Sequence, residues 1–339
     1  MELVNPTPFA AQPAAVADLD GAEYLVVMVK ATYVLDGDGG MAPADAQRGV
    51  ELADVFTGEP GASSLAYASD LAIRKTSTDV VLAGSAYPAR AGDREGEVGV
   101  QIGPAKASFR VFGDREWQAA LGVVRMSRPA PFESIPLCYE RAAGGTDTSP
   151  SAERDHDFDA RNPVGLGFRA KRTQKVVDAT ALPNFERPDA LIRSPEERPA
   201  PAPVGFVAPG WLPRAALAGT YDEAWAEARA PLLPADFDVR FFDVAPSGLT
   251  VPGRLRGDEH GAAMGISPRG LVRFTLPGVQ PVASVASRAL GTLPLDLGLD
   301  RVVVDGDAGV HGEVVLVWSG GLRVRRGFHD LQAITLSLN

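Results

Sequence analysis

The chain has 339 residues, a net charge of −10 and a hydrophobic fraction of 45%, so it is long enough and apolar enough to bury a core. The acidic surplus argues against nucleic acid or an anionic membrane as the main partner. The single cysteine excludes an internal disulfide, and no apolar run approaches the roughly 18 residues of a membrane-spanning helix. The N-terminus lacks the basic and apolar regions of a secretory signal, so we expect a cytoplasmic protein without membrane insertion.

Strand signals dominate the first part of the chain. Residues 23–35 form a Val-rich apolar run closed by the turn sequence Asp-Gly-Asp-Gly-Gly, and residues 78–88 have the character of a second strand. Residues 96–103 and 106–114 predict a hairpin. We therefore expect an N-terminal β subdomain with antiparallel pairing over residues 1–127.

The middle of the chain, residues 128–240, is dense in Pro, Gly and charged residues. Residues 198–213 contain too many prolines for a helix or a central strand and are expected to be extended. One helix is predicted near residues 222–230, with Asp222 as its N-cap and Pro231 as its stop. We expect a long irregular segment with one or few short helices.

Strand signals return in residues 241–339, where we expect a C-terminal β subdomain. The predicted strands are 270–278, 300–307, 312–321 and 331–339. The whole chain, 1–339, is therefore predicted to be one unit with a mainly β fold. Its antiparallel sheets are expected to form a sandwich or barrel-like arrangement, onto which the irregular middle segment packs.

The residue types used in catalysis and metal binding do not form a recognisable motif in the sequence. Cys138 lies between Leu137 and Tyr139, and Pro136 denies it the helix start that could activate a thiol, so a buried structural cysteine is expected. The four histidines lack metal-ligand spacing, and no Gly-x-Ser-x-Gly nucleophile elbow occurs. The sequence predicts no metal, no cofactor and no enzyme activity, while a hydrolase site assembled from acids and arginines of the middle segment remains an alternative.

Charged and polar residues recur beside Trp, Tyr, Gly and Pro in the middle motifs. Such side chains can satisfy the backbone of a segment that lacks strand ladders, so we predict a buried polar network there. Its predicted members are Asp114, Arg115, Trp117, Tyr139, Glu140, Arg141, Asn162 and Asp222. The pair Gly144-Gly145 marks a turn that needs positive φ. If Arg141 is a buried bidentate donor, its loss should cost about 3–5 kcal/mol. The functional alternative is a groove that holds a peptide or a partner domain.

An ordered series of short motifs along the chain resembles one bacterial family. The motifs include Asn-Pro-Thr-Pro-Phe (5–9), "VVMVKATYVL" (26–35), "SDLAIRKTSTDVVLAGSAY" (69–87), "VFGDREW" (111–117), "PFESIPLCYERAAGG" (131–145), "NPVGLGF" (162–168), "AGTYDEAW" (218–225) and "PLLPADFD" (231–238). The sequence is similar in these places to domain of unknown function 2169, which is found beside type VI secretion genes. It departs from the family pattern at Ile73-Arg74, at Ala143 and at Ser319.

The resemblance implies a non-enzymatic adaptor or chaperone. Such a protein would bind a toxic type VI effector and help to load it onto the secreted spike, formed by VgrG and its PAAR tip. A structural component of the spike, co-secreted with it, is the alternative. Aromatic and arginine anchors are typical of the centre of a protein interface, and the candidates are Trp211, Arg214, Tyr221 and Trp225. The same four residues could instead pin the middle segment to the core.

Overall fold

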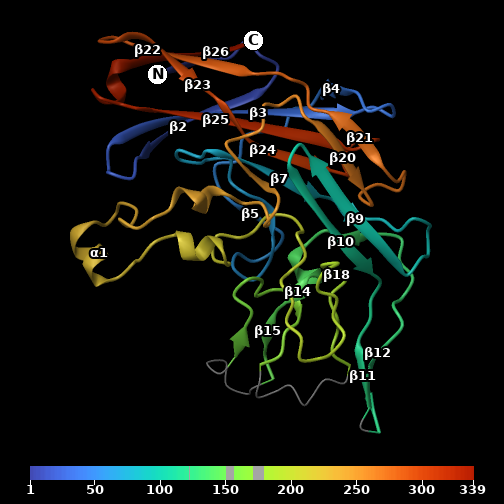
Figure 1. Cartoon of the computed structure of the whole chain (residues 1–339). Helices are drawn as coiled ribbons and strands as arrows, with labels where there is room; N and C mark the ends of the chain where they lie inside the picture. Colours follow the sequence, from blue (N-terminus) through green and yellow to red (C-terminus); the bar gives the residue numbers. More distant parts are fainter. Residues whose placement is uncertain (122, 150–155, 171–178) are drawn as a thin grey trace.

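The computed structural model describes residues 1–121, 123–149, 156–170 and 179–339. It is β-rich, with three larger sheets above a lobe of irregular chain (Figure 1). The mainly β prediction is confirmed. Each of the three sheets is open and nearly all of its pairings are antiparallel; the parallel exceptions are β7 with β24 and β1 with β26. Within the described parts of the chain, no helix has the length and apolar character needed to cross a membrane.

The largest sheet has seven strands in the order β19-β7-β24-β25-β3-β2, with β4 also paired to β3. Its strands are β2 (Ala10–Ala17), β3 (Glu23–Leu35), β4 (Met41–Pro43), β7 (Ser77–Ala83), β19 (Thr250–Pro252), β24 (Gly298–Asp305) and β25 (Glu313–Arg323). β3 and β25 pair over eleven positions, with Val29 opposite Trp318. Strands from both ends of the sequence therefore form one sheet.

Two further sheets combine distant parts of the chain in the same way. The five-stranded sheet has the order β18 (Phe185–Glu186), β10 (Ala105–Phe112), β9 (Glu95–Ile102), β20 (His260–Met264) and β21 (Val272–Thr275). The four-stranded sheet has the order β1 (Glu2–Val4), β26 (Leu331–Leu338), β22 (Pro281–Ser287) and β23 (Gly291–Asp296). The expected N-terminal and C-terminal β stretches, 1–127 and 241–339, are thus interleaved in shared sheets and do not stand as separate bodies.

The two faces of β3 pack into different apolar clusters because successive side chains of a strand point in opposite directions. Leu25 and Val27 belong to the main core, which also contains residues of the other two sheets. Val26 and Met28 belong to a second cluster, which contains Ile73. The large sheet is therefore covered on both faces, which explains why β3 is apolar almost throughout.

The middle segment forms a lobe of short elements below the sheets (Figure 1). Within the middle segment, β14 (Ala143–Gly144) pairs with β17 (Leu166–Gly167), and β15 (Thr146–Asp147) with β16 (Asp157–Phe158). Chain that precedes residue 128 also takes part: β8 (Ser85–Ala86) pairs with β13 (Ile135–Pro136), and β11 (Trp117–Ala120) with β12 (Val123–Met126). β5 (Val55–Phe56) and β6 (Leu65–Tyr67) pair beside the large sheet. The expected lack of long regular elements in this part of the chain agrees with the described residues.

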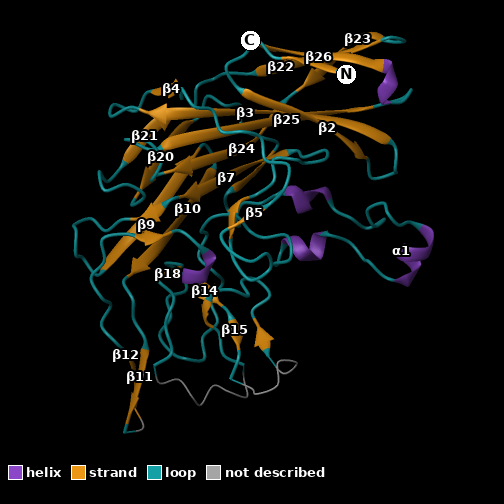
Figure 2. Cartoon of the chain, turned by 180° about the vertical axis from the view of Figure 1, so that it is seen from behind, coloured by secondary structure: helices purple, strands orange, loops and turns teal. Residues whose placement is uncertain are grey.

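An arm, residues 218–238, projects from the body and carries α1 (Glu223–Ala228) (Figure 2). It leaves a 3-10 turn, η3 (Arg214–Leu217), and returns to another, η4 (Val239–Phe242). The backbone N–H of Asp238 donates to Leu217 O at 3.0 Å and joins the two ends of the arm. Elsewhere in the described residues, two further short 3-10 helices are η1 (Tyr139–Arg141) and η5 (Phe328–Asp330).

Candidate functional site

The four residues predicted to contact a partner lie at two depths. Trp211 and Arg214 are buried, with 3% and 5% of their surface exposed. Tyr221 is 54% exposed, and Trp225 is half-buried on α1. The prediction that all four could face a partner is corrected here, because only the two residues of the arm are accessible.

Trp211 and Arg214 hold the base of the arm. The Trp211 ring meets the Tyr139 ring edge-on, with centroids 5.2 Å apart. Arg214 donates from Nε to Phe241 O at 2.9 Å and from Nη1 to Val207 O at 2.6 Å. Burial lowers the pKa of its guanidinium to about 10, so the structure accepts a desolvation cost to fix this position. Both residues therefore act as pins of the middle segment.

The arm itself is a short, capped helix held by its own turns. Asp222 accepts a hydrogen bond from the N–H of Trp225 at 2.8 Å, which confirms the predicted N-cap. Trp225 Nε1 donates to Leu232 O at 2.8 Å and closes the arm on itself. The Tyr221 and Trp225 rings pack edge-on with centroids 4.7 Å apart. Arg229 donates to Leu19 O, which fastens the arm to the turn between β2 and β3.

An apolar groove lies beneath the arm and consists of two adjoining hollows. One, of about 260 Å³, lies between the arm and the body and is lined by Ala17, Ile73, Tyr221, Leu232, Leu233, Phe237, Phe241 and Phe242, among others. The other, of about 300 Å³, has Ile73, Phe241 and Phe242 in common with it and continues to Leu52, Leu71 and Val244. We call the two hollows together the arm groove. Most of its lining is aliphatic or aromatic, which is typical of a surface that takes apolar side chains.

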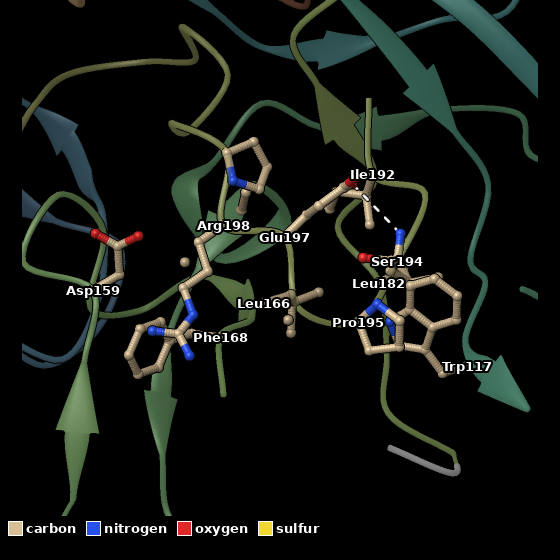
Figure 3. Close-up of a pocket in the computed structure, with 14 residues that line it drawn as sticks. Trp117, Asp159, Leu166, Phe168, Leu182, Ile192, Ser194, Pro195, Glu197 and Arg198 are labelled. Carbon is tan, nitrogen blue, oxygen red and sulfur yellow. Dashed lines mark hydrogen bonds between the residues drawn. The ribbon is translucent and has the colours of Figure 1, made fainter. Parts of the chain in front are cut away.

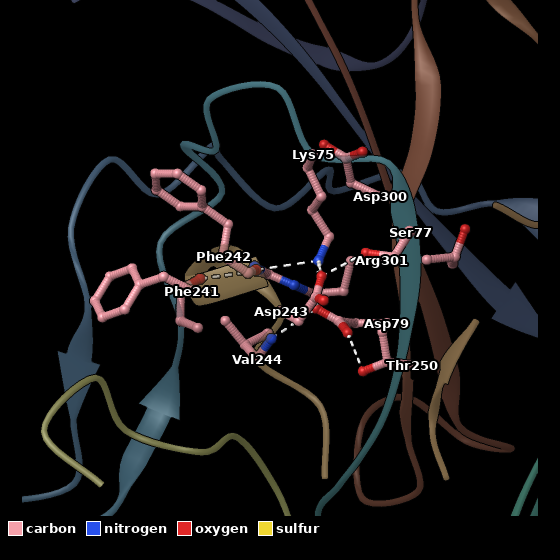
Figure 4. Close-up of polar contacts among 12 residues, drawn as sticks. Lys75, Ser77, Asp79, Phe241, Phe242, Asp243, Val244, Thr250, Asp300 and Arg301 are labelled. Atoms are coloured by element: carbon pink, nitrogen blue, oxygen red, sulfur yellow. Dashed lines mark hydrogen bonds and ion pairs between the residues drawn. The ribbon is translucent and has the colours of Figure 1, made fainter. Parts of the chain in front are cut away.

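Buried ion pairs anchor the chain on which the groove is built (Figure 4). Lys75 Nζ lies 2.8 Å from Asp79 Oδ2 and 2.5 Å from Asp243 Oδ1, directly after η4. Asp79 also accepts from the backbone N–H of Val244 at 2.8 Å and from Thr250 Oγ1 at 2.9 Å. The returning end of the arm is therefore tied to strand β7 of the large sheet. Sequence analysis missed this anchor, although "KTSTD" places a lysine and an acid four residues apart at the start of an apolar strand.

A second ionic group lies on a buried face of the large sheet. Asp70 accepts from Lys30 Nζ at 2.9 Å and from Arg301 Nη1 at 3.0 Å, and all three side chains are at most 5% exposed. Lys30 Nζ also lies 4.0 Å from the centroid of the Tyr67 ring. Burial lowers the pKa of Lys30, and Asp70 opposes that shift. Lys30 and Arg301 interrupt apolar strands, which is a signal that sequence analysis did not use.

Asp300, the residue before Arg301, is a buried acid whose pKa is raised. Burial raises its pKa to about 7 from 3.8, although Arg254 Nη2 lies 2.8 Å away and Ser319 donates to it. Between these two values the folded protein keeps a proton that the unfolded chain releases. The contribution of Asp300 to stability is therefore greatest at low pH and falls as the pH rises toward 7.

We predict that Asp300→Asn changes how stability depends on pH. The amide mimics the protonated acid in both the folded and the unfolded state. The free energy of unfolding of the variant should therefore match that of the wild type only near or below about pH 4, and should exceed it increasingly as the pH rises to about 7. Urea unfolding at a series of pH values measures this difference. An offset between variant and wild type that is the same at every pH would contradict the raised pKa.

Two predicted members of the polar network, Glu140 and Asn162, hold the chain at η1 and at the paired glycines. Glu140 accepts from the N–H of Ser64 at 2.7 Å and from its hydroxyl at 2.5 Å. Burial opposes ionisation of Glu140, but the Ser64 bonds outweigh it and lower the pKa. Asn162 donates from Nδ2 to Tyr139 O at 2.8 Å and to a second carbonyl at 3.0 Å. Gly144 has φ +143°, and a Cβ there would lie 2.3 Å from Asn162 O, so the predicted need for glycine is confirmed.

Arg115 is buried in this lobe, whereas Arg141 is not. Arg115 and Glu186 form a close ion pair with side chains 6% and 1% exposed. The Arg141 side chain is 38% exposed and makes single contacts, at 3.3 Å to Asp114 Oδ1 and 3.0 Å to Asn184 Oδ1. The expectation of a buried bidentate Arg141 is therefore wrong, because the three-residue η1 turn directs that side chain outward.

A small cavity lies in the same lobe (Figure 3). Trp117 lines it with Leu182 and Ile192, and the same three residues form a buried apolar cluster. Its volume of about 20 Å³ has room for about one water molecule. Trp117 was predicted as a member of the polar network, but its ring packs in this apolar cluster. The cavity is too small for an organic ligand.

Cys138 and the acids do not form an obvious reactive centre. Burial, followed by the neighbouring Glu140, raises the pKa of the Cys138 thiol to about 11, so it is protonated at neutral pH. Within residues 1–121, 123–149, 156–170 and 179–339, no group of three or more His, Cys, Asp or Glu side chains is placed to hold a metal ion. Two larger hollows, of about 410 Å³ beside Arg193 and about 500 Å³ beside Arg94, carry many charged residues in their lining, whereas the lining of the arm groove is mostly apolar.

The fold and its contacts define a β-rich protein in which a projecting arm and an apolar groove lie on an ion-paired scaffold. Comparison with known families places the chain among bacterial proteins. It belongs to domain of unknown function 2169, described as an uncharacterized protein conserved in bacteria, whose family model matches residues 20–319. No curated protein and no solved structure matches the chain.

Proposed function

We propose that the chain is a non-enzymatic adaptor that binds a type VI secretion effector and helps to load it onto the VgrG and PAAR spike. The observation that carries the binding role is the arm groove, which presents apolar side chains of Ile73, Phe241 and Phe242 to two adjoining hollows. Side chains such as Asp70 and Asp79 are bound within the scaffold and serve to hold its shape. The type VI assignment is supported by the motif resemblance of the sequence.

A preorganised groove suits an adaptor because binding then orders little of the adaptor itself. The Lys75 anchor and the Arg214 pin fix the two ends of the arm before any partner arrives. An adaptor also has to release its cargo, so a groove of moderate size is more suitable than a deep enclosed site. The hollows of about 260 and 300 Å³ agree with that requirement.

The proposal is tested by a pull-down of the tagged chain from its own host under conditions that induce type VI secretion. We expect mass spectrometry to identify one toxin encoded by a neighbouring gene, with or without a spike protein. An unrelated acidic protein with the same tag is the control. A bait that is verified as folded and recovers no specific partner would contradict the adaptor role. Release of the chain itself into the medium would favour a co-secreted spike component.

A further inference from the structure

We propose that the arm groove binds a partner segment that carries apolar side chains flanked by Lys or Arg. The proposal rests on the adaptor function and deepens it, because it places the contact on this molecule and states the chemistry of the partner. Three features of the groove support the proposal: its apolar floor, its length and the charge of its rim.

The floor of the groove is a cluster of partly exposed aromatic rings. Phe237, Phe241 and Phe242 contact one another with centroids 5.4–5.9 Å apart, and each retains exposed surface. Tyr221 on the arm is 54% exposed and Leu52 on the body 48% exposed, at opposite ends of the groove. These side chains would gain hydrophobic free energy if a partner covered them.

The length of the groove favours a polypeptide segment. The hollow under the arm and the hollow against Leu52 and Leu71 adjoin across Ile73, Phe241 and Phe242. A segment of chain can place one apolar side chain in each hollow, as in other groove-bound peptides. A compact small molecule would fill only one of them.

The arm, residues 218–238, borders the hollow of about 260 Å³ and is acidic, and we call its exposed acids the rim of the groove. Asp222, Glu223, Glu227 and Asp236 are all exposed. Glu223 and Glu227 lie four residues apart on α1, where like charges destabilise a helix. The nearby arginines are already occupied: Arg229 by Leu19 O, Arg240 by Asp238 and Arg74 by Asp18. A partner with Lys or Arg beside its apolar residues would complement this rim.

Two matched pairs of variants test the proposal. Glu223→Lys with Glu227→Lys reverses the rim charge, and Glu133→Lys with Glu196→Lys makes the same change at exposed positions outside the groove. Leu52→Ser removes a leucine of the groove that is 48% exposed. Its control, Leu290→Ser, removes a leucine of nearly equal exposure, 49%, in a turn outside the groove. None of these side chains is buried, so all four variants should fold, which thermal unfolding verifies.

The probes are the partner recovered by the wild-type pull-down and a synthetic helical peptide of Leu and Lys, with a Leu and Glu peptide of the same apolar pattern. We expect the rim reversal and Leu52→Ser each to weaken binding at least about tenfold, and the two matched controls to bind as wild type does. Binding should weaken as salt rises. Hydrogen exchange should slow in residues 218–242 when the Leu and Lys peptide binds.

Equal binding by the groove variants and the wild type, or equal binding of the Leu and Glu peptide, would overturn the proposal. If a recovered partner binds the groove variants normally, the adaptor function stands and its contact lies elsewhere. If the wild type recovers no partner, the adaptor function fails, and the peptide measurements alone decide whether the groove has this specificity.

Discussion

Asp70→Ala is expected to lower the free energy of unfolding by about 3–5 kcal/mol, which is the typical cost of breaking a buried ion pair. The Asp70 carboxylate is fully buried and lies 2.9 Å from Lys30 Nζ and 3.0 Å from Arg301 Nη1. It also accepts from the backbone N–H of Glu51 at 2.9 Å. Its removal leaves two cations facing each other across the sheet without the anion between them. Urea unfolding at neutral pH measures the loss.

Two comparisons separate this explanation from a general effect of substitution. Asp45→Ala removes an exposed carboxylate and should change the free energy of unfolding by less than about 0.5 kcal/mol. The triple variant Lys30→Met, Asp70→Leu, Arg301→Met removes all three charges together and should be closer in stability to the wild type than Asp70→Ala is. A single variant that unfolds within about 1 kcal/mol of the wild type would show that water reaches the two cations.

The strands that could be predicted are those whose apolar pattern is strong on its own. Residues 23–35 are apolar on both faces, and β3 spans Glu23–Leu35 as expected. β22 and β23 were missed. β22 has the sequence Pro-Val-Ala-Ser-Val-Ala-Ser, in which Val, Ala and Ser recur every three residues and give no apolar alternation, even though its alternate residues are buried. The pairing of β3 with β25 joins residues nearly 300 positions apart, and no local pattern specifies such a partner.

The same limit applies to the candidate site. Trp211 and Tyr221 both lie in Pro- and Gly-rich chain, so their sequence surroundings do not reveal their depth. Trp211 is buried because Tyr139 packs against it, whereas Tyr221 lies on an arm that leaves the body. Sequence predictions were correct where a single residue type sets the local backbone conformation, as at the helix N-cap Asp222 and at the positive-φ Gly144. The groove itself arises from chain between Ala17 and Val244, and only the folded molecule brings those parts together.

The ion pairs and the groove are parts of one arrangement. Lys75 holds Asp243, which directly follows Phe241 and Phe242 of the groove floor. Arg214 holds the carbonyl of Phe241 from the other side. A flexible arm would lose conformational entropy when a partner binds. Because the Lys75 and Arg214 contacts already fix the ends of the arm in the folded protein, that entropy is lost during folding and not during binding. This explains why charged residues are buried beneath a surface that is mostly apolar.

Glu186→Leu and Arg115→Met are each expected to lower the free energy of unfolding by about 3–5 kcal/mol, and the double variant by less than either single variant. Each single change removes one member of the ion pair and leaves the other as a buried charge without its partner, in the lobe that contains Trp117. Glu186 also accepts from the N–H of Ile192 at 2.9 Å, and Arg115 Cζ lies 3.8 Å from the centroid of the Phe112 ring. Urea unfolding of the three variants completes a double-mutant cycle for the pair.

The pH dependence of the single variants adds a test of the mechanism. Burial already raises the pKa of Glu186 above its ordinary value. Without Arg115 that pKa should rise further, so Arg115→Met should lose less stability at lower pH, where Glu186 can take up a proton. Arg141→Ala is the contrast, because its 38% exposed side chain should cost no more than about 1 kcal/mol. If Arg141→Ala destabilises the protein more than Glu186→Leu does, Arg141 and not Arg115 is the arginine that holds this lobe.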